Sequence, residues 1–397
     1  MRKIRGKIYV PGRFLHSTTT TRTVKSSSKD SNKLPSQNQV HPKLLRGVYP
    51  VLITPFNPDK RESIDLDSFR KCLSFMKHEI KCQGVTITGV LGEANRLTDF
   101  EKQILIQAAV EENRKDSSST PSNQQFDICV GVAHLGTAAT IDLCQMAAEI
   151  GADSVMVSPS KDSLSAPQPS EESIISLFES ISDACPTTTI VLQDLPSVSG
   201  VHMSMDLMVR MVTEIPQLTT VKLESTPTIT RIANFHAMST IDRNSYSILT
   251  GLGALYAGFD LCHDPTTNVV SISKSIDVVP IRPTDGFMTG FAFPEVLLEM
   301  MHLVNRHQYG EARHLYQSYL PFIVLEQQPG EGLALRKEIY RKRGLITSSH
   351  VRQPGKSLSA ALRTTTESLL ERFFSSRNVD IEKAVPSEQL VSCVNES

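Results

Sequence analysis

The sequence predicts a TIM (β/α)8 barrel with a C-terminal helical extension. From Arg46 onward, short runs of β-branched and apolar residues alternate with stretches of helical length. Eight such runs fall within residues 46–315, a length close to the ~250 residues of a typical barrel of this class. The alternative is an open, doubly wound sheet, but the Gly-x-Gly-x-x-Gly turn of many such sheets does not follow the first run.

The predicted elements follow one another in alternation. The strands read as nearly continuous apolar runs, which is typical of parallel sheets buried on both faces. They are Gly47–Pro55, Gly84–Gly89, Asp127–Val132, Ser154–Pro159, Thr189–Pro196, Thr219–Glu224, Ser247–Leu252 and Gly286–Phe291. The helices between them include Leu66–Glu79, Asp99–Asn113, Thr137–Ile150, Ser170–Ala184 and Asp206–Glu214. Residues that favour N-cap positions stand at four helix starts, namely Asp65, Thr98, Ser170 and Ser204.

The N-terminal segment differs from the barrel in composition. Residues 1–45 are rich in basic and hydroxyl residues, and Asp30 is their only acid. Such a composition is typical of an organellar transit peptide, and the stretch from Arg13 to Ser17 resembles a mitochondrial processing site. We therefore expect a mitochondrial protein, with a plastid or cytoplasmic location and a plain disordered tail as the alternatives.

The chain beyond the barrel is predicted to be helical and then disordered. Residues 316–376 form the expected C-terminal helical region, with amphipathic helices over Gly332–Ile346 and Ser357–Phe373, and residues 377–397 form a tail. We expect the basic residues of the first of these helices to form a solvated face or a subunit contact. They are Arg336, Lys337, Arg341, Lys342 and Arg343.

Composition excludes several classes of function. The formal net charge is −1, so a basic surface for nucleic acid or for an anionic membrane is not expected. No apolar run approaches the ~20 residues of a membrane-spanning helix. The seven cysteines form no Cys-x-x-Cys pair, which indicates reduced thiols and no zinc cage. The consecutive residues Cys262, His263 and Asp264 are a weak metal candidate, because adjacent side chains seldom converge on one ion. The connection Tyr256–Thr284 is long enough to be functional or disordered.

The most informative residue is a lysine inside a predicted buried strand. Lys222 interrupts the run Thr219–Glu224, and an ammonium group there needs a chemical or a structural reason. Burial lowers the pKa of an amine and so increases its nucleophilic fraction, which suits Schiff-base formation with a carbonyl. The structural alternative is an ion pair with Glu224, two residues on and on the same strand face. Because barrel active sites lie at the C-terminal ends of the strands, the position of Lys222 favours the Schiff base.

Several motifs, in order along the chain, resemble the dihydrodipicolinate synthase and N-acetylneuraminate lyase family of class I, pyruvate-dependent aldolases. The resemblance covers roughly residues 46–375, and its landmarks are Gly47–Phe56, Gly89–Glu93 for the family's GTTGE segment, Leu195–Gly200 for YNVPxRTG, Val221–Glu224 for IKE, Gly286–Thr289 and Arg336–Glu338. It implies a TIM barrel, usually tetrameric, in which Lys222 condenses with pyruvate or a related 2-oxo acid without a metal or an organic cofactor. It also implies substrate contacts from Gly89, Val90, Leu91 and Met288.

Departures from the family pattern leave the reaction open. Gln193 stands at the catalytic position of the family's proton-relaying tyrosine, and an amide does not ionise. Val90 and Leu91 replace two hydroxyl residues, so backbone amides remain as donors for a substrate carboxylate. Val198 replaces the arginine that grips the aldehyde substrate in the synthases. We therefore expect a reaction other than dihydrodipicolinate synthesis, and the candidates for moving protons are Glu224, Asp194, His202 and Lys161.

These observations define two main hypotheses of function. The first is a lyase or aldolase that acts on a small-molecule 2-oxo acid through Lys222, with Gln193 and Glu224 at the same site. The second is a non-catalytic descendant that binds a small ligand or a protein partner. A phosphate-binding barrel is a third hypothesis, which rests on Gly251-Leu252-Gly253 after the seventh strand. We expect a homo-oligomer, either a dimer or a tetramer.

Overall fold

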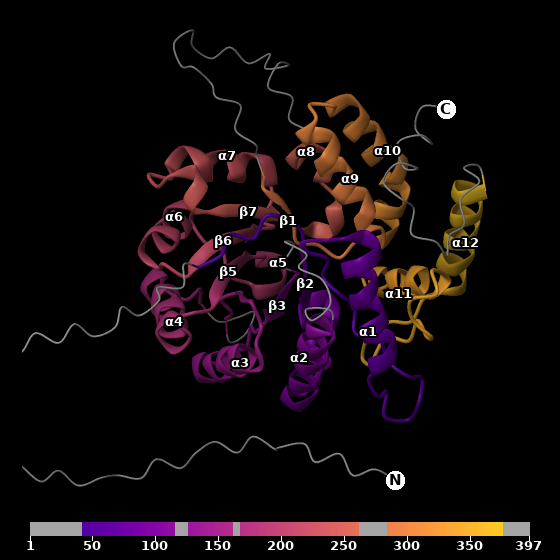
Figure 1. Ribbon diagram of the computed structural model, residues 1–397, viewed down its shortest axis with the longest axis horizontal. Coiled ribbons are helices and arrows are strands. Elements are labelled where there is room, and N and C mark those ends of the chain that lie inside the picture. The colour runs from indigo at the N-terminus through magenta and orange to yellow at the C-terminus, as the bar shows by residue number, and fades with distance from the viewer. Residues whose placement is uncertain (1–41, 116–125, 162–166, 262–283, 376–397) are drawn as a thin grey trace, which may run out of the picture. The chain divides into compact units, whose positions relative to one another are not determined.

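Eight parallel strands form the barrel that the sequence predicts. The structure is a computed structural model, and it describes residues 42–115, 126–161, 167–261 and 284–375. Hydrogen-bonded neighbours run in the order β1-β8-β7-β6-β5-β4-β3-β2. The sheet closes where Val51 pairs with Thr86 in β2 and where the Leu52 amide donates to the Thr86 carbonyl at 2.9 Å. This closure excludes the open doubly wound sheet, and Figure 1 shows the strands encircled by helices.

Most strands end earlier than the apolar runs that predicted them. They are β1 (Gly47–Val48), β2 (Gly84–Ile87), β3 (Asp127–Gly131), β4 (Ser154–Val157), β5 (Thr189–Asp194), β6 (Leu218–Leu223), β7 (Ser247–Thr250) and β8 (Gly286–Phe287). The residues that follow a strand often remain buried, as Leu52 and Ile53 do after β1. Apolar composition therefore extends past the strand end, because the first residues of each loop still pack inside the protein.

The predicted helices between the strands are confirmed. They are α1 (Leu66–Ser74), which continues as a π-helical turn over Phe75–Ile80, α2 (Asp99–Arg114), α3 (Thr137–Ile150), α4 (Glu171–Ala184) and α6 (Met205–Glu214). Asp65, Thr98, Ser170 and Ser204 are N-caps, and each side chain accepts a hydrogen bond from the backbone amide three residues on. The predicted caps therefore set the start of these four helices.

The remaining helices complete the outer ring and the C-terminal extension. They are α5 (Pro196–Ser199), α7 (Thr228–Met238), α8 (Ala257–Asp260), α9 (Pro294–Asn305), α10 (Tyr309–Glu326), α11 (Gly332–Lys342) and α12 (Ala360–Ser375). Helix α10 runs through the boundary expected between residues 315 and 316. Figure 1 shows α11 and α12 beside the barrel, on the side of α1.

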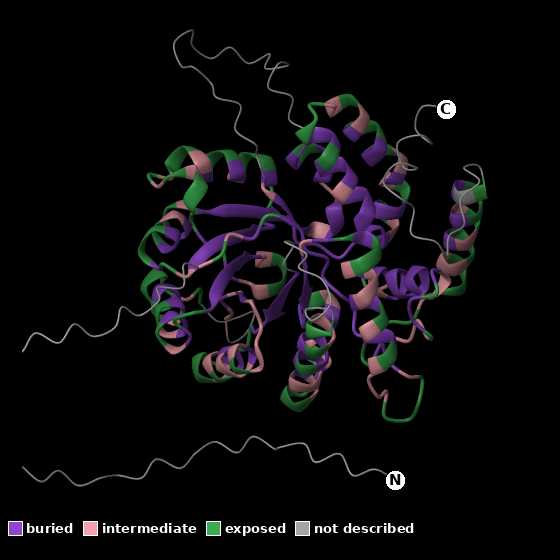
Figure 2. Cartoon of the chain, viewed as in Figure 1, coloured by how far each residue is buried: buried purple, intermediate pink, exposed green. Residues whose placement is uncertain are grey.

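The core has two parts, which the barrel wall separates. The larger cluster fills the space between strands and helices, and a smaller one fills the lumen. The lumen cluster consists of Leu45, Tyr49, Val51, Cys129, Met156, Val191, Leu249 and Met288. Figure 2 shows the strands as the most completely buried elements. A side chain that points into the lumen therefore meets an apolar surrounding.

The basic residues of α11 were predicted to be solvated, and for three of them this prediction was wrong. Arg336 and Lys337 are almost fully buried, and so is Arg343 just after the helix. Each of these cations meets a buried carboxylate from another element. Arg336 pairs with Glu326 at 2.6 Å, Lys337 pairs with Glu93, and Arg343 pairs with Glu295 at 2.7 Å. Lys342 and Arg341 are partly exposed, as expected.

Several sequence predictions concern parts of the chain outside the described residues. Residues 1–41 of the predicted transit peptide, the tail 377–397 and most of the connection 256–284 belong to this group, as do Cys262, His263 and Asp264. Within the ranges that the structure does describe, no group of three or more His, Cys, Asp and Glu side chains is placed to hold a metal ion. Within the same ranges no helix has the length and the apolar character required to span a bilayer.

The buried pair of Lys337 in α11 with Glu93 in the loop after β2 predicts that two lysine variants lose different amounts of stability. Lys337→Met leaves the Glu93 carboxylate buried without this partner, so we expect a loss of about 3 kcal/mol in the free energy of unfolding. Lys342→Met is the matched control, because the side chains of Lys342 and Glu367 are each 36% exposed, and it is expected to cost under about 1 kcal/mol. Urea denaturation measures both losses, and equal losses would contradict the structural role of the Lys337 pair.

Candidate active site

Lys222 points into the lumen of the barrel. Its strand neighbours Val221 and Leu223 belong to the outer core, so the alternation of the strand turns Lys222 inward. In the sheet it is paired with Gln193 of β5 on one side and with Leu249 of β7 on the other. Its side chain is 5% exposed. An ammonium group is therefore held in an apolar lumen, where it requires a counter-charge.

Glu224 supplies that counter-charge, and three donors bind its carboxylate. Lys222 Nζ lies 3.0 Å from Glu224 Oε2, and Gln193 Nε2 donates to the same oxygen at 2.8 Å. The Leu252 amide donates to Oε1 at 3.0 Å. A Cβ at Gly251 would collide with this carboxylate, which explains a glycine at this position. The ion pair expected from the spacing of Lys222 and Glu224 is therefore present, with Gln193 bound to it.

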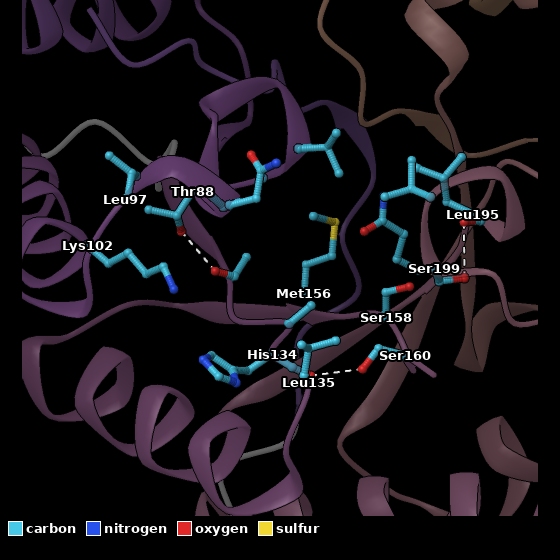
Figure 3. Close-up of a pocket in the computed structure, with 18 of the residues that line it drawn as sticks. Thr88, Leu97, Lys102, His134, Leu135, Met156, Ser158, Ser160, Leu195 and Ser199 are labelled. Atoms are coloured by element: carbon cyan, nitrogen blue, oxygen red, sulfur yellow. Dashed lines mark hydrogen bonds between the residues drawn. The ribbon is translucent and has the colours of Figure 1, made fainter. Parts of the chain in front are cut away.

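A cavity of about 710 Å³ opens at the C-terminal ends of the strands, on the Gln193 side of this group. Gln193, Met156 and Val90 belong to its lining. Figure 3 shows this cavity with Met156 and Ser158 near its centre. Because Gln193 both lines the cavity and binds Glu224, the Lys222–Glu224 pair lies directly behind the cavity wall.

The four predicted substrate-binding residues divide into two pairs. Gly89 and Val90 line the cavity, and Val90 begins a 3-10 turn (Val90–Gly92). The first amides of such a turn have no acceptor within the turn, so they remain as donors for another group. Leu91 packs against the lumen cluster, to which Met288 belongs. The first pair therefore borders the cavity, and the second borders the apolar lumen.

The other candidates for proton transfer lie away from Lys222. Asp194 is the last residue of β5 and alternates with Gln193, so it faces outward, where Ser225 and Arg231 bind it. Burial raises the pKa of Asp194 above its ordinary value, and the bonds from Ser225 and Arg231 oppose that rise. His202 is exposed, and Lys161 packs along Gly200. Glu224 is thus the candidate that the structure brings to Lys222.

The glycine turn after β7 has an internal role. The Leu252 amide is taken by Glu224, and a Cβ at Gly253 would collide with Gln327. The turn is therefore packed from both sides, which weakens the phosphate hypothesis based on Gly251-Leu252-Gly253.

The sequence reasoning missed several residues that line the cavity. Met156 carries a usable signal, because it follows Ser154 by two positions and so shares the lumen face of β4. Lys102 and His134 also line the cavity, from α2 and from the loop after β3. Their helix and loop positions give no periodic pattern that distinguishes them from surface residues.

A closed parallel barrel with a lysine–carboxylate pair in its lumen and a cavity at its mouth defines a TIM-barrel protein with a lysine-centred site. The sequence matches the model of the dihydrodipicolinate synthetase family over residues 44–373, and the chain belongs to this family. Membership supports an aldolase or lyase that acts on pyruvate-type substrates.

Named relatives cover much of the chain. A 4-hydroxy-tetrahydrodipicolinate synthase of Helicobacter acinonychis is 24% identical over 265 residues, which are 66% of this chain and 76% of the relative. An L-2-keto-3-deoxyarabonate dehydratase of Azospirillum brasilense is 25% identical over 309 residues, 78% of this chain and 88% of the relative. The matches thus include both a synthase and a dehydratase.

Solved structures share the fold. A dihydrodipicolinate synthase from Rhodopseudomonas palustris has a TM-score of 0.68 at 28% identity, with 83% of this chain and 97% of that chain covered. A prophage protein of the same family from E. coli, in complex with pyruvate, has a TM-score of 0.68 at 17% identity, with 83% and 99% covered. At 17% identity, the likeness to the E. coli protein shows a shared fold and no more than that.

The buried pair predicts energetic coupling between Lys222 and Glu224. Lys222→Met and Glu224→Gln each leave one buried polar group without its charged partner, whereas the double variant removes both charges. We expect a coupling energy of about 1–3 kcal/mol from a double-mutant cycle measured by urea denaturation. The exposed pair of Arg210 and Glu214 is the control, with an expected coupling of about 0.3–0.5 kcal/mol. Additive losses at Lys222 and Glu224 would contradict the pair.

Proposed function

We propose that the protein is a class I lyase or aldolase that forms a Schiff base between Lys222 and a 2-oxo acid of the pyruvate type. The single observation that carries the proposal is the contact of Lys222 Nζ with Glu224 Oε2 at 3.0 Å, behind the wall of the cavity. A carboxylate at this distance accepts a proton from the ammonium group and leaves a neutral amine as the nucleophile. Family membership supports the same substrate class.

The proton balance of imine formation follows from this geometry. Glu224 takes one proton from the Lys222 ammonium, and the neutral amine attacks the keto carbon to give a carbinolamine. Glu224 then returns the proton to the departing hydroxyl, which leaves as water, and a positively charged imine remains on Lys222. This cation accepts the electron pair when a carbon–carbon bond breaks or when a proton leaves the neighbouring carbon, and an enamine forms. Glu224 replaces the relay tyrosine of the family in this scheme.

Gln193 has a positioning role in the proposal. Its amide donates to Glu224 at 2.8 Å and does not titrate, so it fixes the carboxylate without competing for the proton. Because Gln193 also lines the cavity, an entering 2-oxo acid displaces its side chain to reach Lys222. The substrate carboxylate is then placed at the turn that begins with Val90, whose first amides have no acceptor within the turn.

Reductive trapping tests the chemistry and the substrate class together. Borohydride added with pyruvate, oxaloacetate or 2-oxoglutarate is expected to leave a reduced adduct on the peptide that contains Lys222, as detected by mass spectrometry. Lys222→Arg removes the adduct, because an arginine side chain stays protonated and does not form an imine. Absence of an adduct with every acid would refute the proposal.

A second variant separates the role of Glu224 from that of the fold. Glu224→Gln is expected to lower the trapping rate by about 10²–10⁴-fold, because the amide neither accepts nor returns the proton. Asp194→Asn is the matched control, since it changes a carboxyl group at the end of the neighbouring strand that faces away from the lumen. Circular dichroism checks that both variants fold, and equal trapping rates in the two variants would exclude Glu224 as the proton carrier.

A non-catalytic, ligand-binding protein is the second candidate function. The low exposure of Lys222 and Glu224, at 5% and 6%, favours it, because a buried ion pair also serves as a structural element. Under this alternative pyruvate leaves no adduct on Lys222. The trapping experiment therefore decides between the two functions.

A further inference from the structure

The cavity extends well beyond the space that a molecule as small as pyruvate fills. Gln193, which binds Glu224 of the Lys222 site, lines this cavity together with several apolar side chains. They include Val90, Met156, Leu195 and Val198. Figure 3 shows Leu195 and Ser199 on one side of the view, with Lys102 and His134 on the other. The cavity thus joins an apolar wall to a region that carries nitrogen donors.

Lys102 is the buried cation of this second region. It lies in α2, is 6% exposed, and lines the cavity, and Figure 3 shows its amine directed toward the interior. Its partner is Asp99, whose carboxylate lies 2.9 Å away and whose side chain is 69% exposed. An ion pair with one member so exposed is weak, and a ligand anion replaces the aspartate at little cost because Asp99 then returns to water.

His134 supplies a second donor to the same region. Its Nδ1 accepts a hydrogen bond from the Gly136 amide at 3.5 Å. Ser160 donates to the His134 carbonyl at 2.9 Å, which holds the loop after β3 against the loop after β4. The His134 side chain is exposed and lines the cavity, so its ring nitrogens are accessible to a ligand there.

We propose that Lys102 and His134 bind a distal anionic group of the substrate, and that the apolar wall binds the carbon chain between that group and the keto acid. This inference rests on the proposed function of Lys222 and deepens it, because it names the substrate class as an extended 2-oxo acid with a terminal carboxylate. The charge that the protein buries here is the cation, whereas the acid beside it is exposed. The geometry therefore favours an anion as the ligand of this region.

A chain-length series tests the proposal on the full-length protein. The probes are oxaloacetate, 2-oxoglutarate, 2-oxoadipate and 2-oxopimelate, each compared with the 2-oxo monocarboxylate of equal carbon number, and the readout is the concentration for half-maximal borohydride trapping. We expect one of the longer dicarboxylates to reach half-maximal trapping at a concentration ~10- to 100-fold below that of its monocarboxylate counterpart. Equal concentrations throughout the series would overturn the proposal.

Variants then assign the effect to Lys102. Lys102→Met is expected to abolish the dicarboxylate advantage and to weaken trapping of dicarboxylates more than trapping of pyruvate, because pyruvate has no distal group. Lys115→Met is the control, since Lys115 pairs with Glu112 at the same i,i+3 spacing at the other end of α2, but its side chain is exposed and does not line the cavity. Loss of pyruvate trapping in Lys102→Met to the same degree as loss of dicarboxylate trapping would show a structural role and overturn the proposal.

Asp99→Asn distinguishes an anionic from a cationic ligand. Removal of the competing carboxylate is expected to preserve or to tighten dicarboxylate binding, and a loss of binding in this variant would overturn the proposal. Calorimetric titration with adipate, which has no keto group, measures the distal contact independently of Schiff-base formation. An absent pyruvate adduct refutes the proposed function, whereas a pyruvate adduct without a dicarboxylate advantage refutes only the distal site.

Discussion

The carboxylate of Glu224 is the constraint on which the arrangement of the site depends. A charge inside an apolar barrel is tolerated when it is paired and hydrogen-bonded, and here the donors come from β5, β6 and the turn after β7. Gln193 and Gly251 are both consequences of that requirement. An amide at position 193 gives a donor that keeps its proton, and a glycine at position 251 leaves the space that the carboxylate occupies. The unusual residues around Lys222 are therefore a matched set rather than separate losses.

A second buried ion pair joins the C-terminal extension to the loop after β2. Glu93 follows the turn Val90–Gly92 with a left-handed backbone, and it receives both Lys337 of α11 and Arg96. The C-terminal extension thus fixes the loop whose first amides border the cavity. The Lys337 amine also lies over the Phe56 ring, 4.6 Å from the ring centroid. Lys337 therefore contacts the loop after β1 as well as the loop after β2. Stability of the extension and shape of the cavity are coupled through these contacts.

The features that depend on neighbouring residues could be predicted from the sequence, whereas the contacts between residues far apart in the chain could not. The alternation of eight apolar runs and the N-caps are local patterns, and both were predicted correctly. The spacing of Lys222 and Glu224 is also local, and it offered the ion pair as the structural alternative to a Schiff base. The contact of Gln193 with Glu224 depends on the register between β5 and β6, which spacing along the chain does not encode. The burial of Lys337 was missed for the same reason, because its carboxylate partner lies 244 residues away. Strand ends were overextended because burial continues into the loops.

The ion pair and the nucleophile, which compete as explanations of Lys222 in the sequence, are compatible in the structure. In the resting protein the ammonium is neutralised by Glu224 at 3.0 Å, which a lumen lined by Met156, Leu249 and Met288 requires. On the proposed function the imine that replaces the ammonium is also positively charged, and it forms on the same nitrogen. The charge on the Lys222 nitrogen is therefore equal before and after condensation, and the carboxylate of the substrate is the one charge that is added to the site. A buried pair of this kind stabilises the covalent state for the same physical reason that it stabilises the free protein.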